Sequence, residues 1–240
     1  MNNTVRNIEI LRQNLESLEN DVQRACDVVG RERTEVKVVA VTKYHGVKLN
    51  RDLIAAGHHC FGENRPDQFR EKCEAIESSQ VEWHFIGHLQ RNKIRWVIPH
   101  AHLIHSVDSQ RLLSAISRHA VEAQQVVNCL LEVNISGEAN KDGMSADNVR
   151  NILDNQAQFP NIRFDGLMGM GGLSSSDIEL ANEFSSLEQL LTELQHHRSS
   201  SVPWNQLSMG MSDDFPIAIA QGATLIRVGS RLLEGVQYGT

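Results

Sequence analysis

The sequence has 240 residues, of which 40% are hydrophobic and 22% charged, with a formal net charge of −7 and a pI near 5.9. This length is enough for one large domain with a sizeable core. The negative charge argues against a general nucleic-acid or anionic-membrane surface, which requires a basic field. No apolar run approaches the ~20 residues of a membrane span. Residues 1–26 are unlike a signal peptide, and the four cysteines form no C-x-x-C pair, so we expect reduced thiols in a cytoplasmic protein.

Residues 4–29 carry a heptad pattern. Ile8, Leu15, Val22 and Val29 recur every seven positions, with Leu11, Leu18 and Ala25 between them. The pattern predicts an amphipathic helix, which packs on the domain or forms a short coiled-coil seam with a second chain. We favour packing on the domain, and with it a monomer.

Eight short apolar, mostly β-branched segments follow, and each precedes a helical segment. The predicted strands are 36–43, 59–64, 83–88, 103–108, 126–135 (the longest), 162–168, 206–210 and 224–229. The predicted helices are 50–56, 64–78, 90–98, 109–124, 144–158, 177–197, 215–221 and a last turn from 230. Regular βα alternation indicates a parallel sheet. Eight such units predict an α/β fold, a single (β/α)8 TIM barrel over residues 1–240 with an extra N-terminal helix. A doubly wound open sheet is the alternative.

Lys43 stands at the carboxyl end of the first predicted strand, where active residues of such barrels lie. With a side-chain period of two, Val39, Val41 and Lys43 share one face. Of the six lysines, only Lys43 combines a strand's carboxyl end with an apolar face. Desolvation there would disfavour the ammonium and leave an amine able to attack a carbonyl.

The last strand supplies a second candidate feature. Leu225, Arg227 and Gly229 share a face, which points Arg227 into the barrel. The alternative to a binding role is that Arg227 only pairs with a carboxylate across the barrel. Gly229 and Ser230 can offer backbone N–H groups and a hydroxyl to a phosphate, and the segment 208–212 can add donors. The loops after the last strands are the usual phosphate corner of this fold. An amine facing that corner suits an aldehyde that carries a phosphate.

The histidines do not predict a metal site. His84 and His88 are about 13 Å apart along one strand, too far for one ion. His100, His102 and His105 have no cysteine or carboxylate companions at zinc-like spacing. The glycine-rich segment 169–172 lacks dinucleotide-binding spacing.

Eight motifs run in order along nearly the whole chain. They are 39–43 (VAVTK), 61–64 (FGEN), 83–90 (WHFIGHLQ), 105–108 (HSVD), 133–138 (VNISGE), 166–168 (GLM), 207–214 (LSMGMSDD) and 226–230 (IRVGS). Together they resemble the pyridoxal phosphate homeostasis protein family.

The resemblance implies a barrel like the N-terminal domain of alanine racemase that binds pyridoxal 5′-phosphate (PLP). Lys43 matches the lysine that holds the cofactor as a Schiff base, and Arg227 matches the arginine that faces the pyridine nitrogen. The other matching cofactor-binding positions are Asn64, Ser208, Gly229 and Ser230, the last three at the phosphate. Thr42 and Ser230 replace a serine and a threonine common in the family but keep the hydroxyls. Segments 44–45, 231–233 and 169–172 also depart from commoner versions.

The implied role is intracellular PLP homeostasis, by buffering the cofactor or delivering it to apo PLP-dependent enzymes, with effects on amino-acid and keto-acid metabolism. The resemblance implies no catalytic residue. A PLP-dependent racemase with weak activity is the alternative. Racemisation by two bases needs an acid–base group opposite the lysine; in alanine racemase it is a tyrosine from a second domain and a partner subunit, whereas this sequence ends with the barrel. Because Tyr44 directly follows Lys43, a weak racemase side activity remains an alternative. Other rivals are a lysine aldolase acting on a sugar phosphate and a partner-binding module that uses the heptad face.

Overall fold

Eight parallel strands close into one barrel in the computed structural model, which describes residues 3–138, 141–172, 174–196 and 204–238. The strands pair in chain order and β8 closes on β1. Their bounds are β1 Lys37–Val41, β2 Cys60–Glu63, β3 Glu82–Phe85, β4 Leu103–Val107, β5 Val127–Val133, β6 Ile162–Gly169, β7 Gln206–Ser208 and β8 Leu225–Val228. The closed topology confirms the predicted (β/α)8 barrel and excludes the open sheet.

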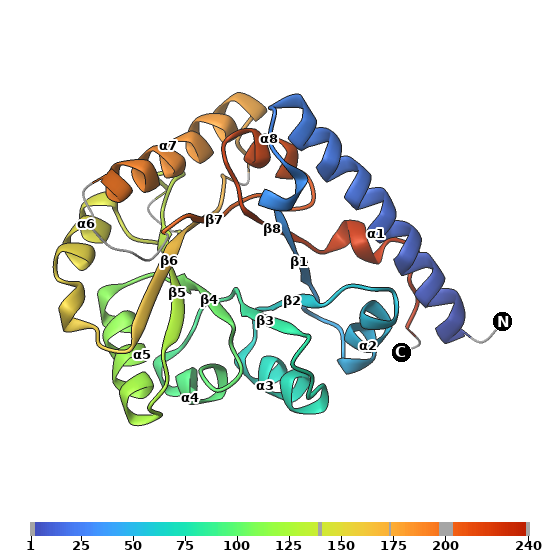
Figure 1. Cartoon of the computed structure of the whole chain (residues 1–240), viewed down its shortest axis with the longest axis horizontal. Coiled ribbons are helices and arrows are strands. Elements are labelled where there is room, and N and C mark those ends of the chain that lie inside the picture. Colours follow the sequence, from blue (N-terminus) through green and yellow to red (C-terminus); the bar gives the residue numbers. More distant parts are fainter. Residues whose placement is uncertain (1–2, 139–140, 173, 197–203, 239–240) are drawn as a thin grey trace.

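The helices form an outer ring around the strands (Figure 1). Their bounds are α1 Asn3–Val28, α2 Val47–Ala55, α3 Pro66–Ala75, α4 Ile94–Val97, α5 Gln110–Glu122, α6 Ala146–Asp154, α7 Asp177–His196 and α8 Phe215–Ala220. Short 3-10 helices are η1 Arg33–Glu35, η2 Arg91–Lys93, η3 Gln156–Gln158 and η4 Ser230–Leu233. Within the described ranges, no helix is both long and apolar enough to cross a membrane.

Besides shifts of a few residues at other element ends, three predicted elements differ from the observed ones. The helix predicted at 144–158 ends at Asp154, where Asn155 leaves the helical conformation and η3 follows. The segment 90–98 divides into η2 and the four-residue α4. The longest strand is β6, with eight residues against seven in β5. β6 shifts register against β5 next to Gly166, whose φ of +154° and close approach to the Gln206 backbone only glycine allows.

The N-terminal helix α1 packs on its own barrel. Leu11, Leu18 and Val22 of the heptad pattern are buried, and α1 contacts α2, α8 and η4. The Asn7 side chain donates a hydrogen bond to the Gln237 carbonyl at 2.8 Å, and that of Asn14 donates to the Leu232 carbonyl at 2.9 Å. The apolar face that a coiled coil would use is therefore covered by the chain itself.

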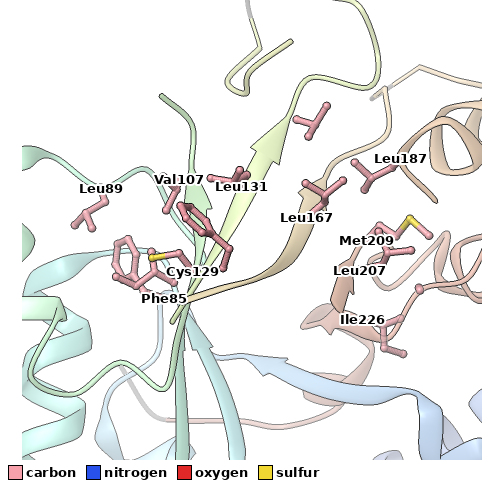
Figure 2. Packing of buried hydrophobic residues seen from close by; sticks show 14 of the residues in the cluster. Phe85, Leu89, Val107, Cys129, Leu131, Leu167, Leu187, Leu207, Met209 and Ile226 are labelled. Atoms are coloured by element: carbon pink, nitrogen blue, oxygen red, sulfur yellow. The ribbon is translucent and has the colours of Figure 1, made fainter. Parts of the chain in front are cut away.

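The core has two layers because every strand is buried on both faces. The outer layer, between strands and helices, contains Phe85, Leu131, Leu167 and Leu207 (Figure 2). The barrel interior holds a smaller apolar cluster: Val39, Cys60, Leu103, Leu130, Met168 and Leu225. It also holds buried polar side chains from β3, β4, β7 and β8, which are His84, His105, Ser208 and Arg227. Since all strands are parallel, their carboxyl ends meet at one mouth of the barrel, above this polar layer.

Candidate functional site

A cavity of about 340 Å³ opens at the carboxyl ends of the strands. Its lining includes Lys43, Asn64, Glu132, Ser212, Arg227 and Gly229. Four of the six residues proposed from the sequence therefore lie around one space. Ser230 directly follows Gly229 and is exposed, and Ser208 is fully buried beneath the cavity.

Lys43 lies in the turn after β1, two residues beyond Val41. Tyr44 follows with φ of +70°, a conformation uncommon for a non-glycine residue. The expectation that packed valines desolvate the Lys43 ammonium is wrong, because its side chain is exposed. Within the described ranges Lys43 makes no hydrogen bond or ion pair; its Nζ lies 5.5 Å from the centroid of the Tyr44 ring. Lys43 therefore presents an uncommitted amine at the cavity mouth.

The buried lysine is Lys72 of α3, which the sequence did not single out. Its side chain is 2% exposed and forms an ion pair with Glu63, which is 0% exposed. Lys72 Nζ also donates to the Thr42 carbonyl at 2.9 Å, and Glu63 Oε1 accepts from the backbone N–H of Asn64 at 2.8 Å. This buried ion pair therefore fixes Thr42, which directly precedes Lys43, and Glu63, which directly precedes Asn64. Its hydrogen bonds make Lys72 a structural group rather than a nucleophile.

Arg227 reaches the floor of the cavity from β8 and is 5% exposed. Its guanidinium donates to Ser208 Oγ at 2.6 Å and to the Gly169 carbonyl at 3.1 Å. Burial lowers the pKa of Arg227 to about 10, while the charges of Glu132 and Asp214 oppose the shift. The guanidinium remains a cation at neutral pH. Among the described residues it is oriented by neutral acceptors and forms no direct ion pair with a carboxylate.

A chain of buried hydrogen bonds supports Arg227 from below. Ser208 Oγ is 2.8 Å from His105 Nδ1, and His105 Nε2 is 2.8 Å from His84 Nδ1. Burial lowers the pKa of both histidines, so both imidazoles are neutral at pH 7. Because its hydroxyl is engaged with Arg227 and His105 and does not line the cavity, Ser208 is placed as support for Arg227.

The corner beside β8 contains the candidate phosphate donors. The Gly229 N–H points at Ser212 Oγ at 3.3 Å, and Ser230 starts the short helix η4. A Cβ at position 229 would lie 3.3 Å from the Val41 carbonyl oxygen, tighter than an ordinary contact. Glycine therefore keeps this corner open. Ser212 was only one member of the predicted donor segment 208–212, and the structure places it, not Ser208, at the cavity wall.

Asn64 lies on the side of β2. Its Oδ1 is buried and has no hydrogen-bond partner among the described residues. A Cβ at Gly87 would come within 2.3 Å of the Asn64 carbonyl oxygen, so glycine is required for this packing. An unsatisfied buried acceptor costs about 1–3 kcal/mol, which marks this wall as a place for a ligand donor.

Glu132 of β5 is a cavity residue that the sequence reasoning missed. It is 4% exposed, and burial raises its pKa to about 7, with the charges of Asp108 and Asp142 adding to the shift and Arg227 opposing it. A carboxyl group near half-protonation at neutral pH can exchange protons. The sequence does contain a sign of this role, because Glu132 is the one charged residue in an otherwise largely apolar strand.

The residues of the cavity fit PLP. A free amine, a fixed cation and a glycine-opened corner with amide and hydroxyl groups match its aldehyde, pyridine nitrogen and phosphate. The unsatisfied Asn64 oxygen fits a donor on the ligand. These groups converge on one cavity, whereas dispersed groups would fit no single small molecule.

Comparisons with known proteins agree with this geometry. The model of the family "Alanine racemase, N-terminal domain" matches residues 13–235. The pyridoxal phosphate homeostasis protein of Aquifex aeolicus is 34% identical over 90% of this chain and 94% of its own. The chain belongs to this family. The resemblance seen in the motifs is thereby confirmed.

A further pyridoxal phosphate homeostasis protein and two solved structures extend the comparison. The one from Synechocystis is 36% identical over 82% of this chain and 90% of its own length. PipY from Synechococcus elongatus, solved with PLP bound, is 31% identical with a TM-score of 0.80 over 92% of this chain and 99% of its own. Alanine racemase from E. faecalis, 15% identical with a TM-score of 0.65 over 94% of this chain and 58% of its own, shares the fold.

Proposed function

We propose that this protein binds PLP in the barrel-mouth cavity, holds it covalently through Lys43, and serves PLP homeostasis as a buffer or donor of the cofactor. The observation that carries the proposal is the convergence of Lys43, Asn64, Arg227 and Gly229 on one cavity. Membership in the family supports it, as does the relative solved with PLP.

Lys43 is the group that bonds to the cofactor. Its exposed, uncommitted amine would hold the cofactor through the aldehyde carbon, in a condensation that releases one water molecule. The reverse reaction with water frees the aldehyde again. Because protein groups do not bury Lys43, water and acceptor molecules can reach this bond. Reversible release is what a buffer or donor needs.

Arg227 sets the electronic character of the site. PLP when bound supplies an aldehyde and an electron-withdrawing ring. A permanent cation at the ring nitrogen disfavours protonation of that nitrogen and weakens the ring as an electron sink. The Arg227 guanidinium, fixed by Ser208 and Gly169, cannot move away from this position without losing two hydrogen bonds. The arrangement suits storage better than decarboxylation or transamination.

We assign the phosphate of PLP to the corner of the cavity beside Gly229. The Ser212 hydroxyl and the start of η4 at Ser230 offer donors to its oxygens. We assign Ser208 to Arg227 rather than to the phosphate, because Ser208 is fully buried and does not line the cavity. The sequence-based proposal for Ser208 is thus replaced by one for Ser212.

A weak racemase activity is the second candidate. Glu132 lines the same cavity as Lys43, and its pKa of about 7 makes it a possible second acid–base group. Deuterium exchange at Cα of alanine or serine tests it. Exchange that Glu132→Gln abolishes would establish the activity, and no exchange above the rate of free PLP would reject it.

The visible spectrum of the purified protein tests covalent binding. We expect an absorption band of the lysine-bound cofactor that borohydride bleaches, with the label on Lys43 in the peptide map. Lys43→Ala should lose the band. Lys48→Ala is the matched control, because Lys48 is also exposed and lies near the same turn but pairs with Asp52. A label on another lysine, or an intact band in Lys43→Ala, would reject the assignment.

Delivery needs its own experiment. The loaded protein is mixed with an apo PLP-dependent enzyme in the presence of an excess of a scavenger of free PLP. Recovery of enzyme activity faster than with an equal amount of free PLP supports delivery to apoenzymes, and equal recovery limits the role to buffering. Sedimentation of the same sample tests the proposed monomer.

A further inference from the structure

A second group of side chains gathers at the opposite end of the barrel, where the strands begin. Cys60 opens β2 and Glu82 opens β3, and the two are partners in the parallel register. His84 stands two residues further along β3. The Cys60 thiol, a Glu82 carboxylate oxygen and a His84 ring nitrogen all lie within 4.8 Å of one another. Along the sequence these residues have no metal-like spacing, and the pairing of β2 with β3 brings them together.

His84 points a buried ring nitrogen at this group, with only a long contact to Glu82. Its side chain is 2% exposed, and Nδ1 is engaged with His105 at 2.8 Å. Nε2 is buried and has no hydrogen-bond partner in the described part of the chain; Glu82 Oε2 lies 3.5 Å away, long for a hydrogen bond. A buried, unpartnered imidazole nitrogen whose ring is already held from the other side is what a metal ligand looks like without its ion.

A further histidine beside the group and an entry path are present. His102, just before β4, has Nε2 at 3.9 Å from Glu82 Oε2, and its ring stacks on that of His84 with centroids 5.6 Å apart. His84 and His102 also line a cavity of about 810 Å³ at this end of the barrel. An ion can therefore reach the group from solvent.

We propose that Cys60, Glu82 and His84, with His102 as fourth ligand, form a binding site for a divalent transition metal of the zinc class. Sulfur and imidazole donors favour zinc or cobalt over magnesium or calcium. Bond lengths of about 2.0–2.3 Å put the ligand atoms of a tetrahedral zinc site ~3.3–3.8 Å apart. Closing the group of Cys60, Glu82 and His84 to that size takes small side-chain movements. His102, which lies outside this group, must turn toward it.

Metal binding requires Cys60 to lose its proton and Glu82 to lose its ion pair with Lys37. The Cys60 thiol releases its proton to solvent and binds as thiolate. Lys37, whose Nζ bonds Glu82 Oε2 at 2.7 Å, gives up that carboxylate. The Lys37 side chain is half exposed and can turn into water. This pair contributes little at a partly exposed position, so losing it opposes metal binding only weakly.

Cobalt titration of the reduced, chelator-treated full chain tests the proposal. Co²⁺ bound by a thiolate gives a near-ultraviolet charge-transfer band, and four-coordination gives intense visible bands. We expect both at one Co²⁺ per chain, with displacement by Zn²⁺. A second set of possible metal ligands, formed by His88, Asp108 and Asp142, lies at the carboxyl-end mouth and contains no cysteine. Cobalt held there would give no thiolate band, so absence of this band in the wild type overturns the proposal.

Single variants locate the ligands. Cys60→Ser should lose the thiolate band, and His84→Asn should weaken Co²⁺ binding by more than about tenfold, the smallest loss that even outer-shell changes cause. Cys73→Ser, in α3, is the matched control and should keep the band. Lys37→Ala should tighten binding because it removes the competitor for Glu82, and this gain remains measurable if a core variant fails to fold. A band that survives Cys60→Ser, or equal affinity in His84→Asn, refutes the site.

Discussion

The buried ion pair between Lys72 and Glu63 offers a strict test of how the site is built. Lys72→Met keeps most of the side chain's length and apolar stem but removes the charge. Glu63, 0% exposed, is then left with its carboxylate uncompensated in the core. The Thr42 carbonyl also loses its hydrogen bond from Lys72 Nζ.

The expected loss follows from what Glu63 retains. Removing one partner of a buried ion pair costs about 3–5 kcal/mol. Glu63 Oε1 still accepts from the backbone N–H groups of Asn64 at 2.8 Å and Arg65 at 3.3 Å, so we expect the lower end, about 3 kcal/mol. For a chain of this size, 1 kcal/mol shifts Tm by ~2–4 °C. The variant should therefore melt about 6–12 °C lower.

Urea unfolding and thermal melting of the cofactor-free protein measure this loss. The double variant Lys72→Met/Glu63→Gln should recover more than half of it, because it removes the stranded charge. Lys93→Met is the matched control; Lys93 stacks on Trp96 at the surface, and its replacement should cost less than about 1 kcal/mol. PLP affinity should fall with Lys72→Met, since Thr42 precedes Lys43. A loss below 1 kcal/mol, or a double variant no more stable than the single one, would refute the reasoning.

Two further predictions concern the cavity floor and wall. Ser208→Ala removes the acceptor of a charge-assisted bond to Arg227 and should destabilise the cofactor-free protein by about 2–4 kcal/mol in urea unfolding, whereas the exposed Ser114→Ala should change stability by less than about 0.5 kcal/mol; a stable Ser208→Ala that only loses PLP would restore the phosphate assignment. The pKa of Glu132, raised from its usual 4.5 to about 7, means that the folded protein holds a proton longer than the unfolded chain, so stability falls as pH rises from about 4.5 through 7, by up to ~3 kcal/mol. Glu132→Gln should flatten this fall in urea unfolding at a series of pH values, and an unchanged slope contradicts the assignment.

The barrel could be predicted because its strands are apolar on both faces and regularly separated by helices. Segments such as 36–43 and 103–108 show this without any long-range information. The carboxyl-end rule then selected Lys43, Arg227 and Gly229, and the family resemblance added Asn64; the structure places all four around one cavity. The prediction succeeded because the local alternation of strands and helices identified the fold, and the fold places its active residues at the carboxyl ends of the strands.

Sequence reasoning was incomplete where the answer depended on contacts between distant segments. Ser208 and Ser212 belong to one motif, and only the tilt and register of β7 decide which faces the cavity and which faces Arg227. Lys72 sits on a helix that looks polar in sequence, so its burial against Glu63 had no local signal. Lys43 was expected to be desolvated by its strand, yet the strand ends at Val41 and the turn carries the lysine outward.

The polar chain inside the barrel explains how the two ends coexist. Arg227 can only donate, so Ser208 Oγ must accept from it. With hydrogen on His84 Nε2, the Ser208 hydroxyl donates to His105 and His105 donates to His84. A metal on His84 Nε2 requires the opposite direction, in which His84 donates to His105 and His105 donates to Ser208. Ser208 has two acceptor lone pairs and accepts from Arg227 in both cases. Arg227 therefore keeps its hydrogen bond to Ser208 whether His84 Nε2 carries a hydrogen or a metal. The barrel interior can thus serve a ligand at each end.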